Sequence, residues 1–154
     1  MQLVPPTTEH LLQMMTWFTT QHQVCQWAGS SFRYPFDIVT FTEDLSLDRL
    51  ASFALVSDRQ ELLGFAQYYP RLEKCHLGRI VVNPTCRGKG ISKALVEQLN
   101  ACGLNQLGLR QSSLFVLKDN QAALNSYLKL GFVESTYPES IPLDHCLYMT
   151  RATK

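Results

Sequence analysis

The chain has 154 residues, a formal net charge of +1, 45% hydrophobic residues and 18% charged residues. This length fits a single domain over residues 1–154 with an apolar core, and the composition is typical of a folded, soluble protein. The low net charge, without a basic run interleaved with aromatic residues, argues against a nucleic-acid partner, and no apolar run approaches the length of a membrane span.

The cysteines and the opening residues bear on the compartment. The first ten residues, MQLVPPTTEH, lack the basic start and the apolar core of a signal peptide. The five cysteines are an odd number without C-x-x-C spacing, so we expect reduced thiols in a cytoplasmic protein. Cys75-His76 and His145-Cys146 are adjacent pairs whose side chains would point to opposite faces of a strand, and we expect no metal site.

Residues 1–50 are predicted to form one strand and two helices. The strand covers Met1 to Val4, and a helix over Glu9 to Phe18 follows Thr7 and Thr8, which can cap it. A second helix is predicted from Asp37 to Leu47. Between the helices, residues 20–36 form a long connection without helical periodicity; its aromatic residues argue against disorder, and loops of this length are usually functional.

The remainder of the chain is predicted to alternate strands with helices. Three strands, Ser52 to Val56, Leu62 to Tyr69 and Leu72 to Val82, precede a helix for which Gly103 is the expected C-cap. A strand from Ser113 to Leu117, a helix capped by Asp119 or Asn120 and closed by Gly131, and strands from Phe132 to Tyr137 and from Leu143 to Thr150 complete the chain. The order β-α-α-β-β-β-α-β-α-β-β predicts an α/β fold with a mixed sheet and helices on both faces.

Residues 80–95, IVVNPTCRGKGISKAL, contain a predicted anion-binding bend. The strand ends in Ile80, Val81 and Val82, and the bend Arg87-Gly88-Lys89-Gly90 leads directly into a helix. Glycines let the backbone approach a ligand closely, and the free N–H groups at a helix start carry partial positive charge. The pattern favours a phosphate-bearing cofactor, although many α/β connections of this form bind no ligand. Nucleotide hydrolysis is a poor fit because G-x-x-x-x-G-K-[ST] is missing.

A second motif makes the first one specific. Residues 116–132, VLKDNQAALNSYLKLGF, place Asn, Ala, Tyr, Gly and Phe at the spacing N-x-x-A-x-x-x-Y-x-x-x-G-F, with Asn120 and Tyr127 among them. Together with the upstream R-x-x-G-x-G/A pattern at Arg87, Gly90 and Ser92, this chain resembles the GNAT superfamily of acyl-coenzyme A dependent N-acyltransferases. Ser92 departs from the usual glycine or alanine, but serine is small and its hydroxyl could donate to phosphate.

The resemblance implies a GNAT-like fold and an enzyme that transfers an acetyl group from acetyl-CoA to a primary amine by direct attack on the thioester. The pyrophosphate would lie on the backbone N–H groups of Arg87 to Ser92, and the pantetheine arm would add to the strand end like an extra strand. An N–H group near Val82 would polarise the thioester carbonyl. The cofactor-binding residues implied in this way are Ile80, Val81, Val82, Arg87, Gly88, Lys89, Gly90, Ile91, Ser92, Asn120 and Tyr127.

The resemblance assigns an acid more clearly than a base. Tyr127 is the implied general acid for the leaving thiolate; the alternative is a tyrosine packed between helix and sheet. Some relatives carry a glutamate where this chain has Phe115, and others where His76 stands, with Glu73 nearby. Strand alternation puts His76 on the face of Gly78, Ile80 and Val82 if no bulge intervenes, and a pKa near 6.5 would suit a base.

The acceptor is expected to bind to residues 21–36 and 138–142. Aromatic walls and one cation are available there, and acids could attract an amine: Trp27, Phe32, Arg33 and Tyr34, and Asp37, Asp44, Glu139 and Asp144. The acceptor remains open as a small-molecule or peptide amine, and a homodimer is open as well. The alternative function is a catalytically inactive acyl-CoA-binding module.

Overall fold

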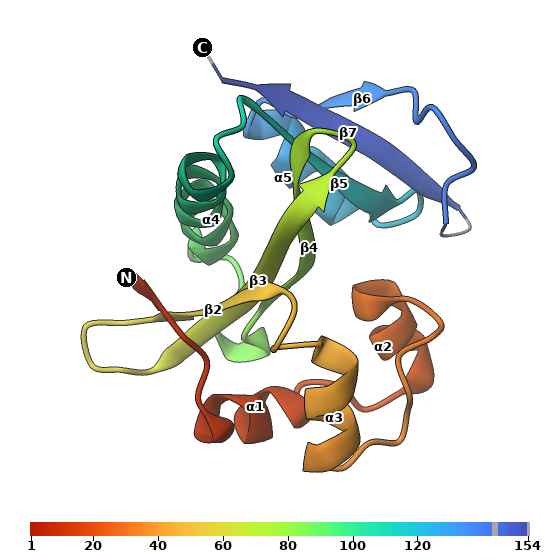
Figure 1. The fold of residues 1–154 in the computed structure, drawn as a ribbon. Coiled ribbons are helices and arrows are strands. Elements are labelled where there is room, and N and C mark those ends of the chain that lie inside the picture. Colours follow the sequence, from red (N-terminus) through yellow and green to blue (C-terminus); the bar gives the residue numbers. More distant parts are fainter. Residues whose placement is uncertain (143–144, 154) are drawn as a thin grey trace.

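The computed structural model describes residues 1–142 and 145–153. Within these residues one seven-stranded mixed sheet runs in the order β1-β2-β3-β4-β5-β7-β6 (Figure 1). The strands are β1 Gln2–Val4, β2 Ala51–Val56, β3 Leu62–Arg71, β4 Lys74–Val82, β5 Gln111–Leu117, β6 Val133–Ser135 and β7 Cys146–Ala152. The helices are α1 Thr8–Met15, α2 Gln21–Ala28, α3 Ile38–Leu45, the short 3₁₀ helix η1 Pro84–Cys86, α4 Ile91–Leu107 and α5 Gln121–Lys129.

Helices cover both faces of the sheet, which confirms the predicted α/β architecture (Figure 1). One core cluster joins α4 and α5 to the sheet and contains Leu95, Leu99 and Phe132. The other joins α1, α2 and α3 to the opposite face and contains Phe41 and Phe65. We call these the α4/α5 layer and the α1–α3 layer. No helix among the described residues has both the length and the apolar character that a membrane crossing requires.

Helix α2 corrects the prediction that all of residues 20–36 form a loop. Thr20 caps this helix by accepting a hydrogen bond from the backbone N–H of Gln23. Val24, Trp27 and Ala28 have helical spacing and pack in the α1–α3 layer, but this apolar pattern covers a single turn and is too short to mark a helix in the sequence. The element order therefore has three helices, rather than two, before β2.

Helix α4 corrects the prediction that Gly103 ends a helix. The helix continues to Leu107, and Gly108, with φ 65°, ends it. A Cβ atom on Gly103 would lie 2.5 Å from Sγ of Cys75. Gly103 therefore serves close packing of α4 on β4 instead of helix termination.

The β3–β4 hairpin corrects one predicted strand start. The predicted start at Leu72 is wrong, because Leu72 and Glu73 adopt φ values of 50° and 62° and form the two-residue turn of the β3–β4 hairpin. Strand β7 begins at Cys146, whereas the predicted start at Leu143, like the acid Asp144, lies outside the described residues.

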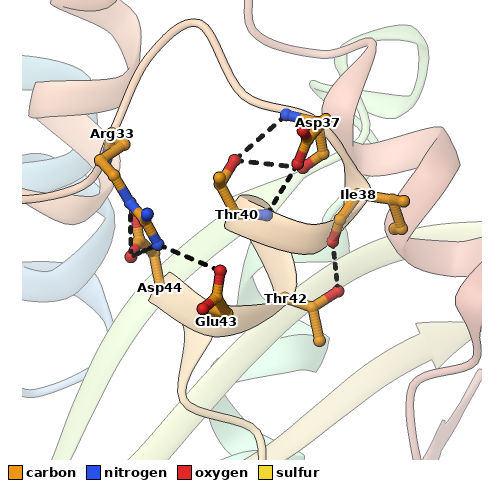
Figure 2. Close-up of polar contacts among 7 residues, drawn as sticks. All are labelled: Arg33, Asp37, Ile38, Thr40, Thr42, Glu43 and Asp44. Atoms are coloured by element: carbon orange, nitrogen blue, oxygen red, sulfur yellow. Dashed lines mark hydrogen bonds and ion pairs between the residues drawn. The ribbon is translucent and has the colours of Figure 1, made fainter.

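The charged residues around α3 have structural partners (Figure 2). Asp37 caps the helix by accepting from the backbone N–H of Thr40 at 2.9 Å, which lowers the pKa of its carboxyl. Arg33 pairs with Asp44 at 2.9 Å and with Glu43 at 3.5 Å. Hydrogen bonds from Arg33 likewise lower the pKa of Asp44. These side chains brace the segment between α2 and α3.

Candidate active site

Strands β4 and β5 separate soon after they pair. Their parallel register covers only Cys75 with Ser112 and His76 with Ser113. Beyond this point β4 stays paired with β3, and β5 stays paired with β7. The ends of β4 and β5 therefore leave an opening in the sheet that no ladder between them closes.

Buried hydrogen bonds anchor the point where the two strands separate. The hydroxyl oxygen of Ser113 lies 2.9 Å from Nδ1 of His76, within hydrogen-bond distance. Its neighbour Ser112 donates to the side-chain carbonyl of Asn100 on α4. Adjacent strand residues point to opposite faces, so one bond lies on each face of the sheet. All four side chains are at most 6% exposed, so the separation begins at a rigid point.

Strand β4 contains a bulge where the opening begins to widen. Phe65 pairs with Val81 and Gln67 pairs with Gly78, so that Arg79 and Ile80 oppose the single residue Ala66. Arg79 has φ 49°, in the left-handed region. The bulge reverses the alternation of side chains along the rest of the strand.

The bulge overturns the predicted common face of His76, Ile80 and Val82. Ile80 and Val82 pack in the α4/α5 layer, whereas Val81 packs in the α1–α3 layer. Cys75 belongs to the α4/α5 layer, so its neighbour His76 faces the other way.

Backbone groups of β4 face the opening. Asn83 donates from its backbone N–H to the carbonyl of Leu63, at 2.8 Å, on the β3 side. Alternate residues of an antiparallel strand direct their N–H and C=O groups to opposite neighbours. The groups of Val82 therefore point away from β3, toward β5, where no strand meets them.

The glycine bend adopts the geometry of an anion cradle. Gly88 and Gly90 have φ values of 80° and 74°, and a Cβ atom on either would meet nothing within 4 Å. Gly90 is the N-cap of α4 and makes no side-chain capping bond. The first N–H groups of the helix have no partner within the helix, so they remain free for an anion.

A cavity of about 360 Å³ lies between this cradle and α5. Its lining includes six of the predicted cofactor-binding residues, together with five further residues. The predicted residues are Val82, Arg87, Gly88, Gly90, Ile91 and Ser92, and the others are Cys86, Lys93, Ser126, Lys129 and Leu130. Arg87, Lys93 and Lys129 supply positive charge, and no acidic residue is in the lining. This charge suits a phosphate-bearing ligand.

The cavity-lining residues Lys93, Ser126 and Lys129 were not predicted from the sequence as cofactor-binding residues. Ser126 and Lys129 lie three positions apart and share a face of α5. That spacing indicates a common face, but only the packing of α5 beside the cradle shows what the face meets. Ile80, Val81, Lys89, Asn120 and Tyr127, by contrast, are outside the lining.

Asn120 and Tyr127 have distinct positions on α5. Asn120 caps the helix, because its side chain accepts from the backbone N–H of Ala123 at 3.3 Å. Tyr127 is buried in the α4/α5 layer, 6.1 Å from Phe132 between ring centroids. Burial raises the pKa of Tyr127 to about 12, so its hydroxyl keeps its proton at neutral pH.

His76 has an environment that differs from the one expected of a base. Its side chain is 2% exposed, and its ring lies 5.2 Å from Tyr69 and 4.7 Å from Phe115. Burial, followed by the positive charge of Arg71, lowers its pKa to about 3, far from the expected 6.5. Glu73 lies in the exposed hairpin turn.

Helix α2 and the segment after it reach the bulge. Nε1 of Trp27 donates to the backbone carbonyl of Arg79 at 2.8 Å, and the Arg79 guanidinium lies 5.4 Å from the ring centroid of Phe32. Gln67 accepts from Nη1 of Arg79 at 3.1 Å. Part of the segment predicted to bind the acceptor thus supports β4 directly. Residues 138–142 form no helix or strand.

The chain belongs to the acetyltransferase (GNAT) family, whose family model matches residues 13–132. It is 37% identical over 75 residues to a mycothiol acetyltransferase of Mycobacteroides abscessus. That match covers 47% of this chain and 25% of the relative, so the chain spans about a quarter of the curated relative it matches.

Solved structures share the fold. A spermidine N-acetyltransferase of Vibrio cholerae, in complex with CoA and spermine, has a TM-score of 0.75 and 16% identity over 99% of this chain and 95% of that chain. The PaiA N-acetyltransferase of Thermoplasma acidophilum, in complex with coenzyme A, has a TM-score of 0.68 and 16% identity over 98% of both chains. A ribosomal-protein-S18-alanine N-acetyltransferase of Escherichia coli has a TM-score of 0.66 and 23% identity over 99% of this chain and 94% of that chain.

Proposed function

We propose that this protein transfers the acetyl group of acetyl-CoA to a primary amine by direct attack of the amine on the thioester. The observation that carries this proposal is the opening between β4 and β5, which ends at the glycine cradle of α4. It combines an unpaired strand edge with a positively charged cavity. The relatives described above are named for acetyl transfer to different acceptors, which supports the reaction but selects no acceptor.

The cradle fits the phosphate groups of coenzyme A. Backbone N–H groups from Arg87 to Ser92 would hold the pyrophosphate, and the open space at Gly88 and Gly90 allows its close approach. Lys93 and Lys129 add charges from two helices. Lys89 is exposed beside the bend and would contribute long-range attraction.

The edge of β4 fits the pantetheine arm, whose amide groups can pair like those of a strand. Val82 would offer its backbone N–H and C=O to this arm, with Ile80 and Val81 beside it, since the edge is not paired with β5. An N–H group at this edge would also stabilise the negative charge that develops on the thioester oxygen. Asn120 would contribute indirectly, by fixing the start of α5 beside the arm.

Acetyl-CoA supplies an activated carbonyl bound to a good leaving group. A bond forms between the amine nitrogen and the carbonyl carbon, the carbon–sulfur bond breaks, and the sulfur leaves with its electron pair. We assign to Tyr127 the proton that neutralises this sulfur, because its hydroxyl is protonated at neutral pH and lies in the same layer as Ile80 and Val82.

The amine must lose a proton before or during its attack. His76 would be the side-chain candidate, but a pKa of about 3 makes it a weak base at neutral pH. We therefore propose that water removes this proton and that His76 acts through its hydrogen bond with Ser113, which fixes the start of the opening.

Two measurements test the function. Thermal-shift titration with acetyl-CoA, coenzyme A and ATP should show stabilisation by the first two, by about 2.7 kcal/mol at a hundredfold excess over Kd. Stabilisation by ATP but not by acetyl-CoA would overturn the proposal. A library of amines should then release free thiol from acetyl-CoA with at least one acceptor. Binding of acetyl-CoA without thiol release from any amine would instead favour the acyl-CoA-binding module.

A further inference from the structure

An arginine among aromatic rings lies on the face of the sheet opposite α4 and α5. Arg71, near the end of β3, donates from Nη1 to the hydroxyl of Tyr137 at 2.8 Å and from Nη2 to the hydroxyl of Tyr69 at 3.2 Å. Its guanidinium carbon lies 5.3 Å from the ring centroid of Phe115. Tyr148 completes this group, with its ring centroid 4.9 Å from that of Tyr137. We call these five residues the Arg71 cluster.

The Arg71 cluster contains buried polar atoms that lack a partner. Among the described residues, only Nε of Arg71 and the hydroxyl of Tyr148 are buried side-chain nitrogen or oxygen atoms without a hydrogen bond. Leaving such groups unsatisfied is costly in free energy. Both atoms belong to one cluster, and both can donate a hydrogen bond. An acceptor group that enters the cluster would satisfy them.

Among the described residues, no carboxylate forms an ion pair with Arg71, in contrast to Arg33 and Arg151, which have acidic partners. The neighbouring His76 experiences the positive charge of Arg71, which contributes to lowering its pKa. A cation that keeps its charge in a half-buried aromatic setting favours an anionic ligand over a cationic one.

The position of the Arg71 cluster relates it to the reaction. Tyr69 pairs with His76 in the β3–β4 register, and His76 pairs with Ser113, two residues before Phe115. The cluster therefore spans the sheet where β4 and β5 begin to separate. Between it and the bulge lies Gly78, where an added Cβ would meet only an atom of the Tyr69 ring, at 3.8 Å. The backbone of β4 is therefore not covered by a side chain at this position.

We propose that the Arg71 cluster binds a carboxylate of the acceptor, so that the acceptor is a primary amine that also carries a carboxylate, as amino acids do. This inference rests on the proposed acetyl transfer and specifies its substrate class. The carboxylate oxygens accept hydrogen bonds from Nε of Arg71 and from the hydroxyl of Tyr148. The amine end of the molecule then extends toward the bulge and the thioester. A polyamine carries only positive charges, so Arg71 would repel it at this position.

The test compares matched acceptors. Amino acids are assayed beside their carboxamides and their decarboxylated amines, with free thiol release from acetyl-CoA as the readout. The free acids should have kcat/KM values about 10- to 100-fold higher than the matched carboxamides, the factor expected for a hydrogen bond to a charged group. Arg71→Gln should abolish this difference by raising KM for the acids much more than KM for the carboxamides. Tyr148→Phe should reduce the difference in part.

A binding measurement separates this inference from the proposed function. Calorimetry of the CoA-loaded protein with N-acetyl amino acids should show binding that Arg71→Gln weakens at least about 10-fold. Arg59→Gln, which removes an exposed arginine of the β2–β3 turn, is the control and should bind as the wild type does. Carboxamides or polyamines that react as well as the acids would overturn the inference while leaving acetyl transfer intact. Absence of thiol release from every amine would overturn acetyl transfer. A Kd for the N-acetyl amino acids that is the same in Arg71→Gln as in the wild type would overturn the inference.

Discussion

Trp27 of α2 donates a hydrogen bond from its indole nitrogen to the backbone carbonyl of Arg79, 52 residues later in the chain, at 2.8 Å. Arg79 is a bulge residue of β4 with φ 49°. The bond therefore links α2, the helix that was not predicted from the sequence, to the bulge of β4 at the candidate site.

Replacing Trp27 with Phe tests whether α2 holds the bulge. Trp27→Phe keeps an aromatic ring but removes the donor to Arg79, and a part-buried hydrogen bond of this kind contributes about 0.5–1.5 kcal/mol. We expect the free energy of unfolding in urea to fall by about this amount and kcat to fall as the bulge loosens. Trp17→Phe is the control, because Trp17 packs on the same layer without this bond. Equal losses in the two variants would show that packing alone matters.

Replacing Gly90 with Ala tests the cradle. The left-handed conformation costs a non-glycine residue about 1–2 kcal/mol. Gly108 has a similar φ, at 65° against 74°, and equally open surroundings, but it lies at the other end of α4. Gly90→Ala and Gly108→Ala should therefore lower the free energy of unfolding alike. Only Gly90→Ala should raise the Kd of coenzyme A in calorimetry, by at least about 10-fold. A similar change in Kd for Gly108→Ala would attribute the effect to strain in the helix.

Replacing Tyr127 with Phe tests the assigned acid. Loss of a positioned proton donor lowers rates by about 10²- to 10⁴-fold, and we expect kcat to fall in this range while the Kd of acetyl-CoA is unchanged. The pKa of Tyr127 is raised to about 12, so the acid form persists from pH 7 to 10 and the wild-type kcat should not decline there through its ionisation. Tyr68→Phe, in the same layer with its pKa also raised to about 12 by burial, should keep its kcat. Full activity of Tyr127→Phe would remove this residue from the mechanism.

The buried His76 should make stability depend on pH. Its pKa is lowered in the folded protein from 6.5 to about 3, so between these values the unfolded chain binds more protons. The stability contributed is fully present above pH 6.5 and is lost as the pH falls toward 3. The free energy of unfolding should fall by up to about 1.4 kcal/mol per pH unit across this window.

Urea denaturation at pH 7, 6 and 5 measures this dependence. His76→Gln should flatten the decrease between pH 6 and pH 5, although it removes the bond to Ser113 and is less stable at pH 7. His22→Gln, at an exposed histidine of α2, should keep the wild-type slope. A slope in His76→Gln that matches the wild type would show that other groups set it.

Much of the fold was predictable because its signals are local. Helix caps such as Asp37 and Asn120 satisfy N–H groups three residues away, and short apolar runs bounded by polar turns mark the strands β2 to β4. Helix α2 was not predicted because its apolar residues Val24, Trp27 and Ala28 cover only one turn, which is too short to define a period. The prediction that Gly103 ends α4 was wrong because the sequence does not distinguish a glycine needed for packing against Cys75 from a glycine that ends a helix.

The sequence by itself predicted the glycine bend from Arg87 to Ser92 and the helix that follows it, because this is one continuous segment whose glycines and helix start carry their own geometry. Only the tertiary structure decided the rest. The bulge at Arg79 reversed the faces of β4, since register depends on the partner strand. Burial among Tyr69, Phe115 and Arg71 lowered the pKa of His76, and the Arg71 cluster was assembled from three strands and a loop. Desolvation and the convergence of distant side chains are properties of packing, which no local pattern encodes.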